Sequence, residues 1–206
     1  MCYTAKDSII AYIINLISSI ILFKNAKNNK IKVISLFFLF VGQMQIFDYI
    51  FWLNQQKSLT NKITTKIAIL FNHLQPIVLF ALLSYYNFSH SKLSLVIFGL
   101  YLIVSILYTI KALKEIDYTL PSKDNIMDWR WNKMNGLMIM YGLFVLTFTI
   151  SFFDFNDFKY ATFLTFINIV SLIIATKTPV LNFSSGRIWC YYASLIPIII
   201  HLIYNK

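Results

Sequence analysis

Seven long apolar runs, separated by shorter polar stretches, restrict the fold of this chain more than any other feature. A helix needs about 20 mostly apolar residues to cross the hydrocarbon core of a bilayer, and the charged and turn-forming residues between the runs indicate where such helices end. The sequence therefore predicts an all-α fold, a polytopic transmembrane bundle of seven helices that forms one domain over residues 1–206. The expected spans are Ser8–Phe23, Val33–Leu53, Ile67–Tyr86, Leu93–Ile110, Gly136–Phe153, Tyr160–Thr176 and Ile188–Tyr204.

Composition excludes a water-soluble globular domain. Hydrophobic residues make up 58% of the chain and charged residues 13%, whereas soluble domains carry about 25% charged residues. The net charge is +10, but the lysines lie between the apolar runs, as Lys24, Lys27, Lys30 and Lys32 do. Lysines in such places are typical of contacts with lipid headgroups. We therefore expect an integral, multi-pass membrane protein whose partner is the lipid bilayer and not nucleic acid, and make no prediction of its oligomeric state.

One linker between the expected spans is long, running from about Lys111 to Asn135, and it carries charges of both signs. Its sequence Trp129-Arg130-Trp131 is typical of an interfacial anchor, in which the indole rings lie among lipid headgroups. The alternative interpretation is an aromatic lid over a binding site.

Polar residues inside the second and third expected spans are the strongest functional signal. An ionisable residue at the centre of a span costs about 2.5–3.5 kcal/mol on insertion scales, so it marks a candidate site. In the second span, Gln45, Asp48 and Trp52 share one helical face. In the third span, His73 is surrounded within about one and a half turns by three further residues, Asn72, Gln75 and Pro76.

Four residues from separate stretches are predicted to lie at a similar depth in the membrane. Because alternate spans run in opposite directions, Asp48 is expected roughly 7–8 Å, and His73 roughly 9 Å, from the side that holds the N-terminus. Cys190 is expected roughly 3 Å inside the same side, with Cys2 near it. His201 lies near the opposite side and does not belong to this group.

These four residues, Cys2, Asp48, His73 and Cys190, form a donor set that suits zinc, which binds thiolate, imidazole and carboxylate. With a water molecule as a further ligand, such a site would hydrolyse a lipid or another interfacial substrate. A metal-free enzyme would use Cys190 or Cys2 as the nucleophile, His73 as the base and Asp48 to orient the histidine. The residues expected to orient and shield the site are Gln45, Trp52, Asn72 and Gln75.

Two other classes of function remain open beside an enzyme. In a structural or interaction protein, Asp48 would hold helices together through hydrogen bonds and no small molecule would react. In a transporter or channel, Asp48 and His73 would bind a proton or a small solute, with Asn15 and Asn168 further along the path. No short ligand motif decides between these classes.

Three short stretches, from the beginning to the end of the chain, carry a resemblance to a known family. They read Met1-Cys2-Tyr3-Thr4-Ala5, Gln45-Ile46-Phe47-Asp48-Tyr49-Ile50-Phe51-Trp52 and Trp189-Cys190-Tyr191-Tyr192-Ala193-Ser194. The chain resembles an uncharacterised family of multi-pass membrane proteins, a domain of unknown function. Its members begin Met-Cys-Phe-Ser-Ala, carry Gln-x-x-Glu-Gly-x-x-Trp in the second helix and end near Trp-Cys-Phe-Phe-Ala-Ala. Asp48 and Tyr49 stand here where that family has Glu and Gly. The resemblance implies where a site lies and implies no chemistry.

Overall fold

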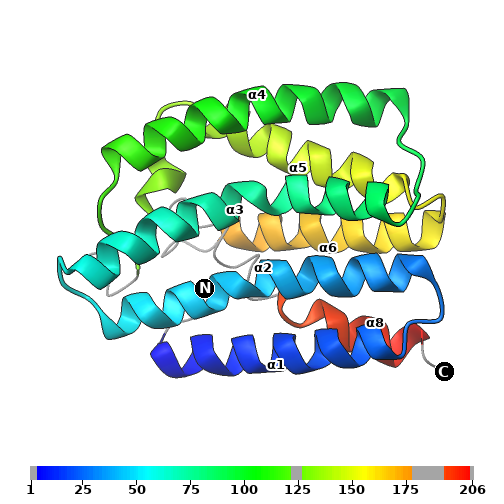
Figure 1. The fold of residues 1–206 in the computed structure, drawn as a ribbon, viewed down its shortest axis with the longest axis horizontal. Coiled ribbons are helices and arrows are strands. Elements are labelled where there is room, and N and C mark those ends of the chain that lie inside the picture. The colour runs from blue at the N-terminus through cyan, green and yellow to red at the C-terminus, as the bar shows by residue number, and fades with distance from the viewer. Residues whose placement is uncertain (1–3, 122–126, 178–192, 205–206) are drawn as a thin grey trace.

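The computed structural model describes residues 4–121, 127–177 and 193–204, apart from the side chains at positions 168, 171–177 and 203–204. Within these residues the fold is an all-α bundle of seven α-helices (Figure 1), as predicted. The α-helices are α1 (Ala5–Lys24), α2 (Asn29–Leu53), α3 (Leu59–Tyr85), α4 (Lys92–Glu115), α5 (Leu137–Phe153), α6 (Phe158–Lys177) and α8 (Ile196–Tyr204), and a 3-10 turn, η1 (Arg130–Lys133), precedes α5.

The first four helices begin at side chains that accept a hydrogen bond from the first helical turn. Thr4, Asn28, Ser58 and Ser91 accept from backbone N–H groups three residues later. Such a cap satisfies one of the four N–H groups that a helix start leaves without a partner in its own helix. These caps, and not the first apolar residue, set where the helices begin. α3 accordingly begins at Leu59, eight residues before the apolar run predicted from Ile67.

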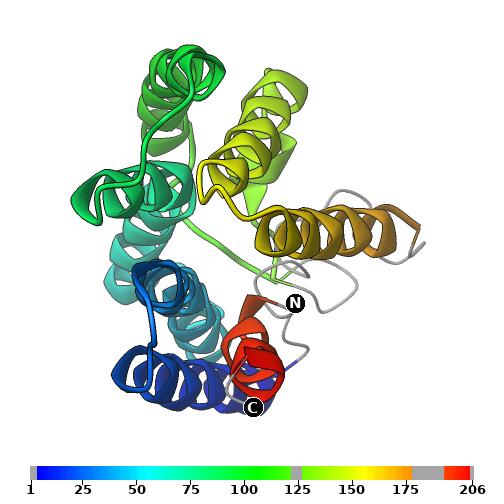
Figure 2. The same cartoon turned by 90° about the vertical axis from the view of Figure 1, so that its right-hand side faces the viewer.

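Helices that follow one another in the chain pack side by side as far as α6. α3 also contacts α5, and α8 contacts α1 and α2. Figure 2, seen along the bundle, shows α4 and α5 at one side and α1 with α8 at the other. The seventh predicted span begins at Ile188, and the residues before Ala193 in it lie outside the described part of the chain.

The outer surface of the bundle is apolar. On α4, six exposed apolar side chains recur every three or four residues, which is the spacing of one helical face; they are Leu93, Val96, Leu100, Ile103, Leu107 and Ile110. Leu95 and Ile106 widen this exposed face. Among the described residues, α1, α2, α3 and α4 are long and apolar enough to cross a membrane, and α5 is a shorter apolar helix. An apolar face of this extent on four helices is unfavourable in water.

The interior holds many of the polar side chains. Asn15 of α1 is fully buried against Gly42 of α2, where an added methyl group would lie 2.0 Å from the Asn15 Oδ1 atom. The absence of a side chain at Gly42 therefore leaves the room that the buried Asn15 amide occupies between α1 and α2. Aromatic rings fill much of the remaining core, including an edge-to-face pair of Phe37 and Phe148 with ring centroids 5.3 Å apart.

Candidate functional site

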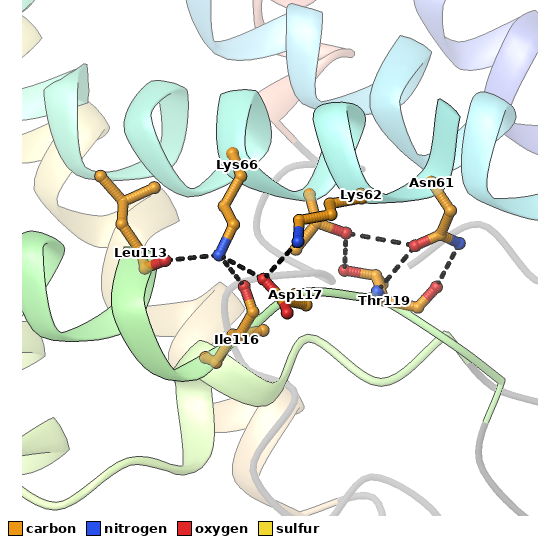
Figure 3. Close-up of polar contacts among 8 residues, drawn as sticks. Asn61, Lys62, Lys66, Leu113, Ile116, Asp117 and Thr119 are labelled. Atoms are coloured by element: carbon orange, nitrogen blue, oxygen red, sulfur yellow. Dashed lines mark hydrogen bonds and ion pairs between the residues drawn. The ribbon is translucent and has the colours of Figure 1, made fainter. Parts of the chain in front are cut away.

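The α4–α5 linker comprises residues 116–136, of which the structure describes 116–121 and 127–136. Its first described part is hydrogen-bonded to the first turns of α3. Asn61, which is fully buried, donates to the backbone oxygen of Thr119 at 2.8 Å and accepts from its backbone N–H at 3.0 Å. The Thr65 hydroxyl donates to the Thr119 hydroxyl at 3.0 Å. Figure 3 shows this pairing beside a second contact made by Lys62 and Lys66. The polar residues that extend α3 beyond its apolar run therefore bind the linker.

Lys66 joins the end of α4 to the start of the linker. Its ammonium group donates to the backbone oxygens of Leu113 and Ile116 and lies 3.0 Å from the Asp117 carboxylate. A lysine in this position satisfies carbonyl groups that the last turn of a helix leaves open. The hydrogen bond from Lys66, aided by Lys62, lowers the pKa of Asp117 below its ordinary value of 3.8.

The tryptophans of the linker are buried inside the protein. Trp129 is 2% exposed and Trp131 is fully buried, and their indole rings stack with centroids 5.1 Å apart. The interpretation of Trp129-Arg130-Trp131 as an interfacial anchor is therefore wrong, because both indole rings are enclosed by protein and neither is exposed on the outer surface. The two indole rings instead bury their apolar surface inside the bundle, and the N–H group of Trp129 donates a hydrogen bond there.

Asp48 is held by the linker. The Trp129 indole N–H donates to the Asp48 Oδ1 atom at 3.0 Å, and Asp48 is almost completely buried. A buried carboxylate is costly unless hydrogen bonds or charges compensate it. The indole N–H supplies part of that compensation and in turn fixes where Trp129 lies.

His73 is held by α4. Its Nδ1 atom lies 2.7 Å from the Thr109 hydroxyl, and the Tyr101 hydroxyl donates to the His73 backbone oxygen at 2.6 Å. The imidazole ring also meets the Tyr108 ring edge to face, with centroids 5.5 Å apart. The Nε2 atom is buried and has no hydrogen-bond partner among the described residues.

A third contact joins α3, the linker and α5. The Asn72 amide donates to the Tyr141 hydroxyl at 2.6 Å, and that hydroxyl donates to the Asn132 side-chain oxygen. The Tyr108 hydroxyl donates to the backbone oxygen of Trp131 at 2.6 Å. The linker is thus bound by α2, α3, α4 and α5. We call this set of buried hydrogen bonds the polar centre; its members are Asp48, Asn72, His73, Tyr108, Thr109, Trp129, Trp131, Asn132 and Tyr141.

Asp48 and His73 contribute to the polar centre separately. Asp48 lies five residues from the end of α2, whereas His73 lies 14 residues from the start of α3, about 21 Å at the helical rise. The membrane depth of roughly 9 Å predicted for His73 was counted from Ile67, so it stays a prediction about the apolar part of α3. Thr109, and not Asp48, is the partner of the His73 Nδ1 atom. The hypothesis that Asp48 orients His73 as a base is therefore wrong, because the His73 Nδ1 atom is bonded to Thr109.

The other predicted site residues divide into two groups. Gln45, Asn72 and Gln75 are buried and Trp52 is half-buried, so all four face the bundle interior at least in part. Both amide atoms of Gln75 are buried without a hydrogen-bond partner among the described residues. Cys2 and Cys190, the thiols of the predicted zinc set, lie outside the described residues. Within the described part of the chain, no three His, Cys, Asp or Glu side chains cluster as metal ligands do.

Several members of the polar centre were missed by the sequence reasoning. α4 carried a usable signal, because its buried face repeats at helical spacing in an otherwise Leu-, Ile- and Val-rich helix; that face comprises Ser94, Tyr101, Ser105, Tyr108 and Ala112. No comparable signal marks Asn132 or the pairing of Trp129 with Asp48. That pairing joins residues 81 positions apart.

Comparison of the chain with known protein families, curated proteins and solved structures finds no match. The resemblance to a family of multi-pass membrane proteins therefore stays a prediction from the three motifs. Functional inference depends on the geometry of this chain alone.

Proposed function

We propose that the chain is an integral, multi-pass membrane protein whose α4–α5 linker forms a plug, held inside one end of the bundle by the polar centre. The apolar outer faces of α1, α2, α3 and α4 support the membrane location. Retention of the full-length protein in membranes after extraction at alkaline pH is the expected result. Release into the supernatant would overturn the membrane assignment.

The burial of both linker tryptophans carries the plug proposal. Trp129 and Trp131 bring a large apolar area from a connecting segment into the interior, where Asp48 accepts the Trp129 N–H. Connecting segments normally run over the surface, because their backbone polar groups need water or other partners. Here Asn61, Lys66 and Tyr108 supply those partners. A plug of this kind separates the bundle interior from the aqueous phase on its side.

A second candidate function, zinc binding, is favoured by the surroundings of His73. Metal-bound histidines commonly donate one ring N–H to a neighbour while the other nitrogen binds the ion. If the Nδ1–H of His73 donates to Thr109, its buried Nε2 atom keeps a lone pair for such an ion. Cys2 and Cys190 are the further donors that the sequence suggests. Asp48, which accepts from Trp129 apart from His73, is left out of this set.

The metal content of the purified full-length protein distinguishes the two candidates. A zinc site predicts about one zinc per chain, lost in His73→Ala, because removal of one of a few ligands severely weakens a site of this kind. His201→Ala is the matched control, since His201 belongs to α8, outside the polar centre. A structural plug predicts the same metal content in all three proteins, and a lower stability of His73→Ala.

The plug has its own test in the accessibility of the linker. Limited proteolysis should leave residues 127–136 of the wild-type linker intact and cut them in Trp129→Ala, because that variant loses the indole and its bond to Asp48. Equal rates of cleavage in the two proteins would contradict the plug. A plug that holds without zinc leaves the membrane assignment intact and removes the zinc candidate.

A further inference from the structure

A second polar cluster lies at the opposite end of the bundle from the linker, where α3 turns into α4 (Figure 1). α3 ends in a Schellman motif: the Phe88 N–H bonds the Leu83 oxygen at 2.9 Å, and the Asn87 N–H bonds the Ser84 oxygen at 3.1 Å. Asn87 has the left-handed conformation, with φ 60°, that this motif requires. The turn folds the chain back on itself, so that His90 reaches the exposed Ser84 side chain six residues earlier.

His90 is fixed on three sides. Its Nε2 atom lies 2.8 Å from the Ser84 hydroxyl oxygen, and its Nδ1 atom lies 3.0 Å from the Asp154 Oδ2 atom. One face of the imidazole ring stacks on Phe80 of α3, with centroids 3.7 Å apart and an interplanar angle of 9°. The ring is therefore held in the plane in which both of its nitrogen atoms meet their partners.

Asp154 is fixed independently of His90. It is buried at the end of α5, where its Oδ2 atom accepts from the Ser94 hydroxyl at 2.6 Å and its Oδ1 atom accepts from the Ser91 N–H at 3.2 Å. Ser91 is the residue that caps α4, and Ser94 lies in the first turn of that helix. The carboxylate is thus oriented by one helix and presented to a histidine in the preceding turn.

The partners of His90 determine which of its nitrogen atoms carries the proton. An ionised carboxylate can only accept hydrogen bonds, so Nδ1 of His90 must donate to Asp154. In a neutral imidazole the Nε2 atom then carries a lone pair, which can accept a proton from the Ser84 hydroxyl. In the structure that hydroxyl donates to the Phe80 backbone oxygen at 3.0 Å, and a rotation about its C–O bond turns the proton toward Nε2, which lies 2.8 Å from the hydroxyl oxygen.

We propose that Ser84, His90 and Asp154 form a serine hydrolase site that cleaves acyl esters. A nucleophile within hydrogen-bond reach of a base, which a third group orients, is the arrangement that activates serine on unrelated folds. Ser84 and His90 are the catalytic residues and Asp154 is the positioning residue. The proposal does not rest on the plug or on zinc, because the cluster shares no residue with the polar centre.

The surroundings favour a lipid ester over a water-soluble ester. A hollow of about 380 Å³ lies beside the cluster on the side of His90 and Asp154, and Ser84 is not among its lining residues. Its wall combines the polar residues Ser89, Ser91 and Asn156 with the apolar side chains of Leu93, Ile150 and Phe153. Leu93 and Phe153 are exposed. The cluster joins the ends of three apolar helices, α3, α4 and α5, where acyl chains meet their polar headgroups if these helices span a bilayer.

The reaction balances without a metal or a redox partner. The Ser84 oxygen forms a bond to the carbonyl carbon and its proton passes to Nε2 of His90, while the carbonyl electron pair moves onto oxygen. When that pair returns, the bond to the alcohol breaks, and the alcohol leaves with the proton from Nε2. Water then adds to the acyl-serine in the same manner, and the products are a carboxylic acid and free Ser84.

An alkyl fluorophosphonate probe tests the site on the full-length protein in detergent. The probe forms a phosphorus–oxygen bond with an activated serine as fluoride leaves and the serine proton passes to the base. We expect peptide mapping to find the label on Ser84 of the wild-type protein, and Ser84→Ala to abolish it. His90→Gln should slow labelling about 100-fold or more, the usual effect of removing a general base. Ser105→Ala is the control, because Ser105 also bonds a carbonyl of its own helix but lies in α4, away from the cluster.

Each result decides the proposal. A wild-type protein that remains unlabelled, a label on another serine, or labelling of Ser84 that is unchanged in His90→Gln would overturn the hydrolase site. Asp154→Asn should slow labelling and Asp154→Glu should partly restore it; equal rates in both variants would leave Asp154 no positioning role. Faster turnover of a long-chain ester in mixed micelles than of a short-chain soluble ester supports the lipid substrate, and the reverse overturns it.

Discussion

Two histidines, His73 within α3 and His90 in the turn between α3 and α4, have opposite surroundings. His73 lies in the middle of α3, is 2% exposed, and meets a neutral hydroxyl group on Thr109. His90 lies in the turn after α3, remains partly exposed, and meets the carboxylate of Asp154. The same side chain is thus sealed inside the bundle in one place and accessible from its end in the other.

This difference indicates which role each of the two regions is suited to. A histidine enclosed in an apolar interior and bonded to a neutral hydroxyl is suited to act as a hydrogen-bonding or ligand-binding group. A histidine between a carboxylate and an exposed hydroxyl can exchange a proton with a substrate. Chemistry is therefore expected at the α3–α4 turn, and structural stability at the polar centre.

The largest effect on stability is expected at the polar centre. Trp129→Ala removes a buried indole and the N–H that Asp48 accepts. Substitutions of this size in a core cost about 3–5 kcal/mol of unfolding free energy. Trp129→Phe keeps most of the ring but loses the N–H, and should cost about 1–3 kcal/mol. Unfolding in detergent measures both, and a Trp129→Ala protein as stable as the wild type would contradict the buried linker.

A smaller loss is expected at the α3–α4 turn. Asp154→Asn weakens three hydrogen bonds, from His90, Ser91 and Ser94, at a buried position. We expect a loss of about 1–3 kcal/mol in the same unfolding measurement. Asp157→Asn is the matched control, because its partly exposed ion pair with Lys30 should contribute under about 1 kcal/mol. A larger loss in Asp157→Asn than in Asp154→Asn would reverse this assignment.

The smallest effect is a pH dependence of the linker attachment. Because the hydrogen bond from Lys66 lowers the pKa of Asp117 from 3.8, the charged carboxylate is favoured in the folded protein. Its contribution is therefore complete above pH 3.8 and is lost as the pH falls below that value. We expect the wild type to exceed Asp117→Asn in unfolding midpoint at neutral pH, with a difference that shrinks toward zero in that acidic range. If the difference in unfolding midpoint grew on acidification, the charged Asp117 carboxylate would not stabilise the folded protein as proposed.

Much of the fold follows from local sequence, and the helix ends show why some of it does not. α2 ends at Leu53 as predicted, because Asn54 and the polar residues after it stop the apolar run. α3 begins eight residues before its predicted start, since Ser58 caps the helix and Asn61 and Lys66 find partners in the linker. Apolar periodicity reports which residues face lipid or core; caps and distant partners decide where a helix begins.

The candidate sites also combine features that the sequence predicts with features that it does not. The burial of Asp48 and His73 inside their helices could be predicted, because a charged or polar side chain within a span avoids lipid. Their separate partners, Trp129 and Thr109, could not be predicted, since helix phase says nothing about the neighbouring helix. Ser84 and His90 lie only six residues apart, but their meeting depends on the left-handed turn at Asn87.

By itself, the sequence determined an all-α fold, the seven helices seen among the described residues and the polar character of α2 and α3, because these depend on composition and on contacts between near neighbours in the chain. Only the tertiary structure decided that the linker tryptophans lie inside the bundle and that Asp154, 64 positions from His90, completes a cluster with Ser84. Such contacts join residues far apart in the sequence. They exist only once the helices have packed, so no local pattern encodes them.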